Sequence, residues 1–525
     1  MSNAGPQDNK DGERVEEAGL ARSGIIVALM TSVSRITGLI REVVFAAVFG
    51  DGAAADAFFV AFKIPNFLRR LFAEGAFSQA FVPVLSEYRR TRSREQVKAL
   101  IDHVAGSLGM ILCIVTVAGV LGAPFIAALF APGYLDSPAN FQLLTDLLRL
   151  TFPYILLISL TGYAGSILNS YGRFAVPALT PVWLNLSLIT CALVLSPLLE
   201  VPIMALAWGV LLAGMIQLMF QLPFLYHLRM FPRPRLDRKN EGVNRIIALM
   251  IPIMFSVSVG QINLMLDTIL ATTQVVGSVS WLYYSDRLLE LPLGIFGIAI
   301  ATVILPSLSR IHAEQSRQKF VKTLDWGLRC IILMGLPACL ALIVLSEPLI
   351  FTLYQRGEFG VESVAPTVLS LQAYALGLLG FMAIKVLANA YFSRQDTVTP
   401  VRYAVIAMVA NMVFNLILIL PLAHVGLALA TSMSAFINAG LLLRGLVING
   451  HFEIGKHWLG FLARLLLACA AMVLLLLYML PETAQWQAWS DWQRVLQLLL
   501  LCSVGALVYV LGLLALGLRP AHFRY

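Results

Sequence analysis

Residues 34–79 read SRITGLIREVVFAAVFGDGAAADAFFVAFKIPNFLRRLFAEGAFSQ, and this stretch decides the fold of the chain. Two apolar segments are interrupted by charged side chains, namely Arg35, Arg41, Glu42, Asp56, Lys63, Arg69, Arg70 and Glu74. A cation at the centre of a bilayer-spanning helix costs roughly 2.5–3.5 kcal/mol. Because several such charges exceed what a simple membrane anchor needs, the stretch predicts a water-filled cavity inside a helix bundle, with walls that hold an anion.

The composition of the whole chain is that of a membrane protein. Of its 525 residues, 59% are hydrophobic and 13% are charged, with a mean hydropathy of +0.82. Apolar runs of the ~20 residues that cross a bilayer recur from end to end, and they are continuous rather than alternating, which excludes a β-barrel. We therefore expect an all-α polytopic membrane protein, and we assign the net charge of +8 to cytoplasmic loops rather than to nucleic-acid binding.

Fourteen apolar runs predict fourteen transmembrane helices. Their expected spans are 24–49, 54–86, 99–130, 141–169, 176–197, 203–228, 243–273, 278–309, 322–353, 363–392, 399–421, 425–448, 457–480 and 493–517. Lys and Arg gather in the loops after even-numbered helices, whereas loop 131–140 has neither. The exceptions are Arg356 and Arg494. The positive-inside rule therefore predicts that both termini are cytoplasmic.

An internal repeat relates residues 24–228 to residues 243–448. Pro83 then matches Pro306, and Asn169 matches Asn389. Six helices in each copy give both copies the same orientation, so we expect two parallel six-helix lobes around a central cavity. The expected domains are a disordered cytoplasmic tail at 1–22, partly a cloning remnant, an N-lobe at 23–235, a C-lobe at 236–452, and two extra helices with the C-terminal tail at 453–525.

Cations outnumber acids inside the predicted helices. The cations are Arg35, Arg41, Lys63, Arg69, Arg70, Arg287 and Lys385, and the acids are Glu42, Asp56, Glu74, Asp286 and Glu290. Salt bridges that lock helices together are the alternative interpretation. The excess of cations, and the fit of guanidinium to bidentate phosphate contacts, instead indicate an anionic substrate, a phosphate or diphosphate. In the second of these helices, Pro65-Asn66 predicts a break.

A second polar cluster is expected in the C-terminal half. Asp267 is an isolated acid in the seventh predicted helix, and Asn411 and Asn415 share a face of the eleventh. Thr431 follows on the twelfth. One carboxylate with neutral oxygens suits a small hard cation. The alternative is a polar cluster that packs helices together.

No catalytic motif stands out in the sequence. The chain has no Walker A motif, its seven histidines lack ligand spacing, and its six cysteines lie within apolar segments. We therefore expect a transporter rather than an enzyme, with no required cofactor and no disulfide.

Several segments closely resemble the MurJ (MviN) family of lipid II flippases, within the multidrug/oligosaccharidyl-lipid/polysaccharide (MOP) exporter superfamily. They are SRITGLIRE (34–42), DAFFVAFKIPNFLRRLFAEGAFSQAFVPVLSEY (56–88), TFPYILLISL (151–160), GSVSWLYYSDRLLELPLGIFGIAIATVILPSLS (277–309) and YFSRQDTVTPV (391–401). The resemblance implies two six-helix lobes and two C-terminal helices that form a lipid-facing groove.

The resemblance also implies a substrate and its contacts. The substrate is undecaprenyl-diphosphate-linked disaccharide pentapeptide, moved from the inner to the outer leaflet of the bacterial inner membrane for peptidoglycan synthesis. The family's cavity residues match Arg35, Arg41, Arg69, Arg287, Asp56, Lys63, Glu74, Asp286 and Glu290. The Na⁺ site of some members matches Asp267, Asn411, Asn415, Thr431 and the carbonyl of Leu427.

These expectations combine into a monomeric flippase that works by alternating access among membrane lipids. The energy source is either the membrane potential or a Na⁺ gradient. One alternative is a flippase for another polyprenyl-diphosphate oligosaccharide, which residue chemistry alone does not distinguish. Another is a drug/cation antiporter like those of the MATE family, which needs an acidic or aromatic cavity. A membrane-embedded glycosyltransferase or ligase needs larger loops with catalytic acids.

Overall fold

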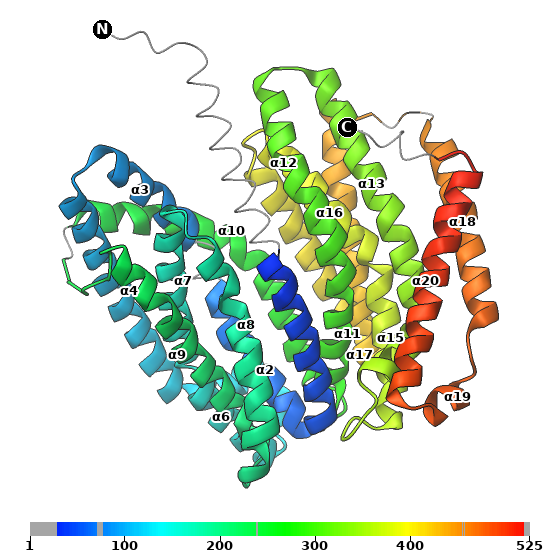
Figure 1. Ribbon diagram of the computed structural model, residues 1–525, viewed down its shortest axis with the longest axis horizontal. Helices are drawn as coiled ribbons and strands as arrows, with labels where there is room; N and C mark the ends of the chain where they lie inside the picture. The colour runs from blue at the N-terminus through cyan, green and yellow to red at the C-terminus, as the bar shows by residue number, and fades with distance from the viewer. Residues whose placement is uncertain (1–28, 71–76, 238–239, 454, 456, 519–525) are drawn as a thin grey trace. The chain divides into compact units, whose positions relative to one another are not determined.

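The computed structural model describes residues 29–70, 77–237, 240–453, 455 and 457–518 (Figure 1). The tail predicted at 1–22 and Glu74 lie outside these residues. Helices account for most of the described chain, none of which is a strand. Ten helices in it are long and apolar enough to cross a membrane. The prediction of an all-α polytopic membrane protein is confirmed, while the count of fourteen spans stays a prediction.

The chain forms two compact units. Unit 1 contains residues 1–48 and 57–261, and unit 2 contains residues 49–56 and 262–525. The short segment 49–56 thus joins unit 2, although the helices on either side of it belong largely to unit 1. The domain limits expected from the repeat, at 235/236 and 452/453, stay predictions.

Unit 1 contains the first helix at 29–49 and the start of α10 (Glu241–Ala271). Between them lie α2 (Ala53–Arg69), α3 (Ser78–Thr91), α4 (Arg94–Leu121), α5 (Ala123–Phe130), α6 (Pro138–Thr151), α7 (Tyr154–Ser170), α8 (Ala175–Thr190) and α9 (Met204–His227). The helix α2 runs through Pro65, so the predicted break at Pro65-Asn66 is wrong. Phe58, Phe59 and Phe62 are buried along it, and this packing outweighs the one backbone donor that a proline removes.

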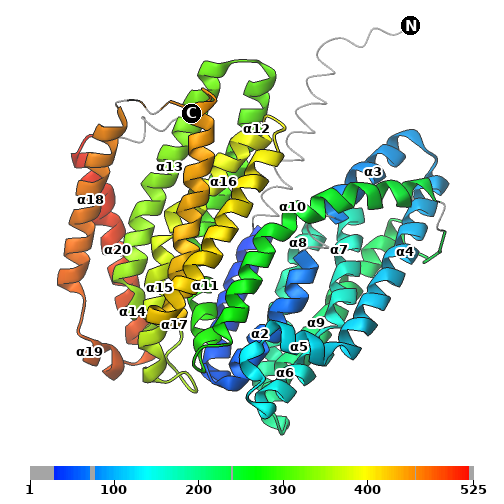
Figure 2. The same ribbon diagram turned by 180° about the vertical axis from the view of Figure 1, so that it is seen from behind.

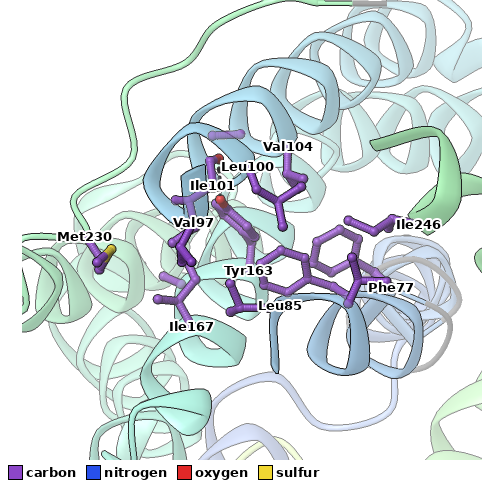
Figure 3. Close-up of a cluster of buried hydrophobic side chains, with 14 of the residues drawn as sticks. Phe77, Leu85, Val97, Leu100, Ile101, Val104, Tyr163, Ile167, Met230 and Ile246 are labelled. Carbon is purple, nitrogen blue, oxygen red and sulfur yellow. Dashed lines mark hydrogen bonds between the residues drawn. The ribbon is translucent and has the colours of Figure 1, made fainter. Parts of the chain in front are cut away.

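The core of unit 1 is a cluster of aliphatic and aromatic side chains from α3, α4 and α7 (Figure 3). Phe77 and Phe81 stack on each other and meet Tyr163 edge-on. The Tyr163 hydroxyl donates to the carbonyl of Ile101 at 2.6 Å, so this buried phenol is satisfied. Ser93 begins α4 with a capping box that it forms with Gln96.

The main part of unit 2 begins at Ile262, within α10. It contains α11 (Ser278–Pro292), α12 (Ile298–Ala313), α13 (Arg317–Val344), α14 (Ser346–Leu353), α15 (Val364–Leu376), α16 (Leu378–Phe392), α17 (Val398–Ile448), α18 (His457–Met479), α19 (Thr483–Ala488) and α20 (Asp491–Ala515). The long α17 is interrupted at Ala423, with φ 48° and ψ −132°, two residues after Pro421. The interruption lies where the sequence predicts the boundary between two spans, 399–421 and 425–448.

The last two long helices, α18 and α20, lie side by side and pack on α13 (Figures 1 and 2). Polar contacts also hold them there, and two of these reach α13. The indole nitrogen of Trp458 donates to Asp325 at 2.7 Å, and the Tyr509 hydroxyl donates to the Leu333 carbonyl at 2.5 Å. These helices are therefore attached to the body of unit 2 by hydrogen bonds as well as by apolar packing.

Candidate substrate and cation sites

Arg41 is the most deeply buried of the predicted cavity arginines in unit 1. Its side chain is 11% exposed and forms an ion pair with Glu42. One guanidinium nitrogen, Nη1, donates to Oδ1 of Asn185 on α8 at 2.9 Å. The guanidinium carbon also lies 5.6 Å from the centre of the Phe45 ring. A carboxylate, a carboxamide and an aromatic ring thus surround this cation and stabilise its charge in an apolar helix.

Arg287 has a different environment, in unit 2. It lies on α11 between two acids, with Nη1 at 2.7 Å from Glu290 and Nη2 at 3.5 Å from Asp286. The Tyr283 ring lies 5.0 Å from its guanidinium carbon. The side chain of Arg287 is 27% exposed and that of Glu290 is 43% exposed, so this group is more accessible than Arg41. The structure therefore brings three of the predicted residues together on a single helix.

The remaining predicted cations of unit 1 are partly exposed. Arg35 lies on the first helix, two turns before Glu42, while Lys63 and Arg69 lie on α2. The Arg69 Nε donates to Oδ1 of Asn66 at 3.2 Å, which holds the guanidinium close to its own helix. All three side chains are partly buried in the described structure.

Asp56 is held by another helix rather than by a cation. It is 3% exposed, and Oδ2 accepts the backbone N–H of Gly277 at 2.7 Å. Its other oxygen accepts the backbone N–H of Ser280 at 2.8 Å and the Ser280 hydroxyl at 2.5 Å. A carboxylate in this position caps the first turn of α11, as an acid at a helix N-terminus does. Asp56 is thus bound to the helix that carries Arg287.

The segment around Asp56 makes further contacts in unit 2. The Tyr284 hydroxyl donates to the carbonyl of Gly50 at 3.0 Å, and the Trp281 indole donates to Asp51. Gly50 has φ +62°, and a Cβ there would come within 2.5 Å of the Glu358 carbonyl oxygen. Only glycine combines this backbone conformation with such a close approach. Segment 49–56 is therefore fitted closely to α11 and to the loop that holds Glu358.

The second polar cluster assembles around Asp267 as the sequence predicts. Asp267 Oδ1 accepts from the carboxamides of Asn411 and Asn415 at 3.0 and 2.7 Å. The Thr431 hydroxyl lies 2.8 Å from Asp267 Oδ2 and 3.0 Å from the Leu427 carbonyl. All five of these residues are buried. Two helices, α10 and α17, thus bring one carboxylate and several neutral oxygens to one place.

Both carboxamides of this cluster point their nitrogens at Asp267 and their oxygens away from it. The carboxamide oxygens of Asn411 and Asn415 are buried and accept no hydrogen bond from the described residues. Buried oxygens of this kind are the groups that a hard cation satisfies. If both carboxamides rotated, their oxygens would face the Asp267 carboxylate, an arrangement that is repulsive unless a positive charge lies between them.

Two polar residues in these networks were not predicted from the sequence. Asn185 joins α8 to the first helix, where it contacts Arg41 and the Ser34 carbonyl, and Asn263 accepts from the Asn411 carboxamide at 2.9 Å. Asn185 is the one carboxamide of α8, and Asn263 lies in a mostly apolar part of α10; a carboxamide in such a setting is the signal that could have found each of them. Asn263 also lies four residues before Asp267, on the same face of α10.

Comparison with known proteins identifies the family. The family described as "Lipid II flippase MurJ" matches residues 45–496 of this chain. A Vibrio cholerae protein named "Probable lipid II flippase MurJ" is 51% identical over 507 residues, which cover 95% of this chain and 97% of the relative. The chain belongs to the MurJ family of lipid II flippases. Another MurJ relative, from Burkholderia cenocepacia, is 37% identical over 96% of this chain and 99% of its own length.

Solved structures agree with this family assignment. The structure titled "Lipid II flippase MurJ, inward closed conformation" has a TM-score of 0.77 and 28% identity, over 93% of this chain and 98% of the other. An inward-facing MATE-family multidrug resistance transporter of the MOP superfamily has a TM-score of 0.68 and 16% identity, over 81% of this chain and 98% of the other. The second likeness shows the fold alone, so it gives no support to the drug-antiporter alternative.

Proposed function

We propose that this chain moves lipid II from the inner to the outer leaflet of the bacterial cytoplasmic membrane. The observation that carries the proposal is its similarity to MurJ proteins along almost its whole length. The chain is a multi-pass bacterial membrane protein of the MurJ family. The finer parts of the proposal are that it acts as a monomer, that both termini are cytoplasmic, and that it makes or breaks no bond in its substrate.

The headgroup chemistry accounts for the arginines. Lipid II carries a diphosphate, and guanidinium groups bind phosphate oxygens in pairs and keep their charge at any working pH. Arg287 is flanked by Glu290, whose side chain is 43% exposed, so an incoming diphosphate can replace this carboxylate on the guanidinium. Arg41 is presented in a fixed position. We propose that alternating access exposes these arginines first to one side of the membrane and then to the other.

The polyprenyl tail needs a different surface. Exposing it to water costs about 0.8 kcal/mol for each CH₂ group, so the tail stays in lipid while the headgroup crosses. Helices α18 and α20 carry exposed leucines along their outer sides, among them Leu459, Leu467, Leu474, Leu499 and Leu507. We propose that the tail lies along this pair of helices.

Complementation of bacteria depleted of their own lipid II flippase tests the function. The wild-type chain should restore growth, whereas Arg41→Ala and Arg287→Ala should not, at equal abundance in the membrane. Arg149→Ala is the matched control, because the Arg149 side chain is 47% exposed and forms an exposed ion pair with the nearby Asp146. Growth with either cavity variant would contradict the role of that arginine. Failure of the wild-type chain would contradict the lipid II assignment itself.

We also propose that Asp267, Asn411, Asn415, Thr431 and the Leu427 carbonyl hold Na⁺, whose gradient would then contribute energy to transport. A bound ion stabilises the folded state by an amount that grows with its concentration. Raising Na⁺ at constant ionic strength, with K⁺ as the balancing ion, should therefore raise the melting temperature of the wild-type protein. Asp267→Asn should abolish this rise. A wild-type protein that does not respond to Na⁺ would make the cluster a packing feature and leave the membrane potential as the energy source.

A further inference from the structure

Asn185 is a buried carboxamide that the proposed transport cycle has not yet used. It is 5% exposed and lies on α8, in the apolar sequence VWLNLSLIT. A carboxamide buried without hydrogen bonds is strongly unfavourable, so its partners determine what it does. Those partners lie on one other element, the first helix of unit 1.

The contacts of Asn185 define the orientation of its carboxamide. Its oxygen accepts from Arg41 Nη1 at 2.9 Å. Its nitrogen donates to the Ser34 carbonyl and to the Thr37 hydroxyl oxygen, both at 3.0 Å. A guanidinium has only donors and a backbone carbonyl only accepts, so the reverse orientation would oppose donor to donor and acceptor to acceptor. One side chain therefore binds Arg41 and, about two turns away, the backbone of the same helix.

This arrangement fixes the direction of the guanidinium from outside its own helix. Glu42 and Phe45 also contact Arg41, but both belong to the first helix and move with it. The hydrogen bond to Asn185 instead ties the Arg41 guanidinium to a second helix, α8. An arginine side chain has many rotamers, and holding it in one of them before the ligand arrives lowers the entropy lost on binding.

We propose that Asn185 is a positioning residue, which holds the Arg41 guanidinium in the orientation that receives the diphosphate of lipid II without touching the substrate itself. This inference rests on the proposed function. A neutral carboxamide suits the task, because it accepts a hydrogen bond and adds no second negative charge beside Glu42, which already pairs with Arg41. A carboxylate in the same place would compete with the phosphate oxygens.

Binding of lipid II to the purified full-length chain in lipid nanodiscs tests the proposal. Hydrogen bonds to charged groups contribute enough that losing one weakens affinity tenfold or more, so Asn185→Ala should raise the Kd by about tenfold. Asn185→Asp preserves the size and the acceptor, and should also weaken binding, by at least as much. If Asn185 served only to hold α8 against the first helix, both variants would lower the melting temperature, because both remove the nitrogen that donates to Ser34 and Thr37. The affinity of the folded variants for lipid II would then stay nearly unchanged.

A double-mutant cycle shows whether the effect passes through Arg41. In the Arg41→Ala background, Asn185→Ala should change the Kd by less than about twofold, because the group that it positions is gone. The matched control is Gln217→Ala, which removes another buried carboxamide of unit 1 whose hydrogen bonds in the described structure go to the Thr180 carbonyl, at 3.0 Å, and to Tyr154. This variant should lower the melting temperature and leave the lipid II affinity unchanged.

Each other outcome overturns the proposal. Equal losses of affinity from Asn185→Ala with and without Arg41 would make Asn185 a structural residue, as would an aspartate variant that binds like the wild type. If Asn185→Ala does not fold, the lipid II affinity of Asn185→Asp, measured with and without Arg41→Ala, tests the proposal instead. A wild-type chain that binds no lipid II would overturn the proposed function first, and the positioning role with it.

Discussion

Arg41 and Arg287 are the same side chain in two different surroundings. The Arg41 side chain is 11% exposed, with a nearly buried carboxylate beside it and a carboxamide from another helix in contact. The Arg287 side chain is 27% exposed, and both of its acidic neighbours come from its own helix. The comparison teaches that a charge in an apolar helix can be accommodated in two ways, by buried neighbours that include another helix or by more exposed neighbours on its own helix.

Among variants that remove a partner of these arginines or of their helices, the largest loss of stability is expected at Glu42. Removing one partner of a buried ion pair leaves an uncompensated charge, so Glu42→Ala should lower the free energy of unfolding by about 3 kcal/mol. Thermal unfolding of the purified protein measures the change. Glu87→Ala is the control, because Glu87 forms an exposed ion pair with Arg245 and should matter little. Equal stability of the two variants would mean that Glu42 does not compensate the charge of Arg41.

A smaller effect is expected at Asp56, which caps the helix that carries Arg287. Asp56→Ala removes the acceptor of two backbone N–H groups at the start of α11 and should lower the free energy of unfolding by about 1–2 kcal/mol. Transport should also fall, since the helix that carries Arg287 loses its attachment to segment 49–56. Ser280→Ala keeps both backbone contacts and should lose less stability. An Asp56 variant that unfolds at the wild-type temperature would contradict the capping role.

The smallest effect is expected at Glu290. Its side chain is 43% exposed, and exposed ion pairs three residues apart on a helix contribute little. Glu290→Ala should therefore change the free energy of unfolding by no more than about 0.5 kcal/mol, as measured by the same thermal unfolding. A loss as large as that of Glu42→Ala would show that the two arginines are held in the same way.

Hydropathy, charge and the family motifs were enough to predict the helical membrane fold, the MurJ family and the residues that gather around Asp267. Spacing along a helix brought Asn411 and Asn415 to one face, and the structure places both on the Asp267 carboxylate. The break predicted at Pro65-Asn66 failed, because proline weakens a helix locally while burial of neighbouring phenylalanines acts along its whole length.

Contacts between distant segments could not be predicted in this way. From the sequence, Asp56 is predicted to be one of several charges near a cavity. Only the fold shows that it contacts the N-terminus of α11, more than two hundred residues later in the chain. Asn185 lies 144 residues from Arg41 in the sequence, and no periodicity connects the two. Such partners are set by tertiary packing, which a single sequence does not encode in any local pattern.

Arg494, an exception to the alternation of loop charges, binds mostly main-chain oxygen. It is 6% exposed and donates to the carbonyls of Phe351, Gln355, Trp486 and Gln487, and to the Gln355 side chain. Carbonyl acceptors are supplied by every amino acid, so this attachment depends on the path of the backbone more than on which side chains α19 and its neighbouring residues carry. Exposed positions of this segment should therefore tolerate substitution as long as its length and course are kept, whereas the buried Trp486 should not.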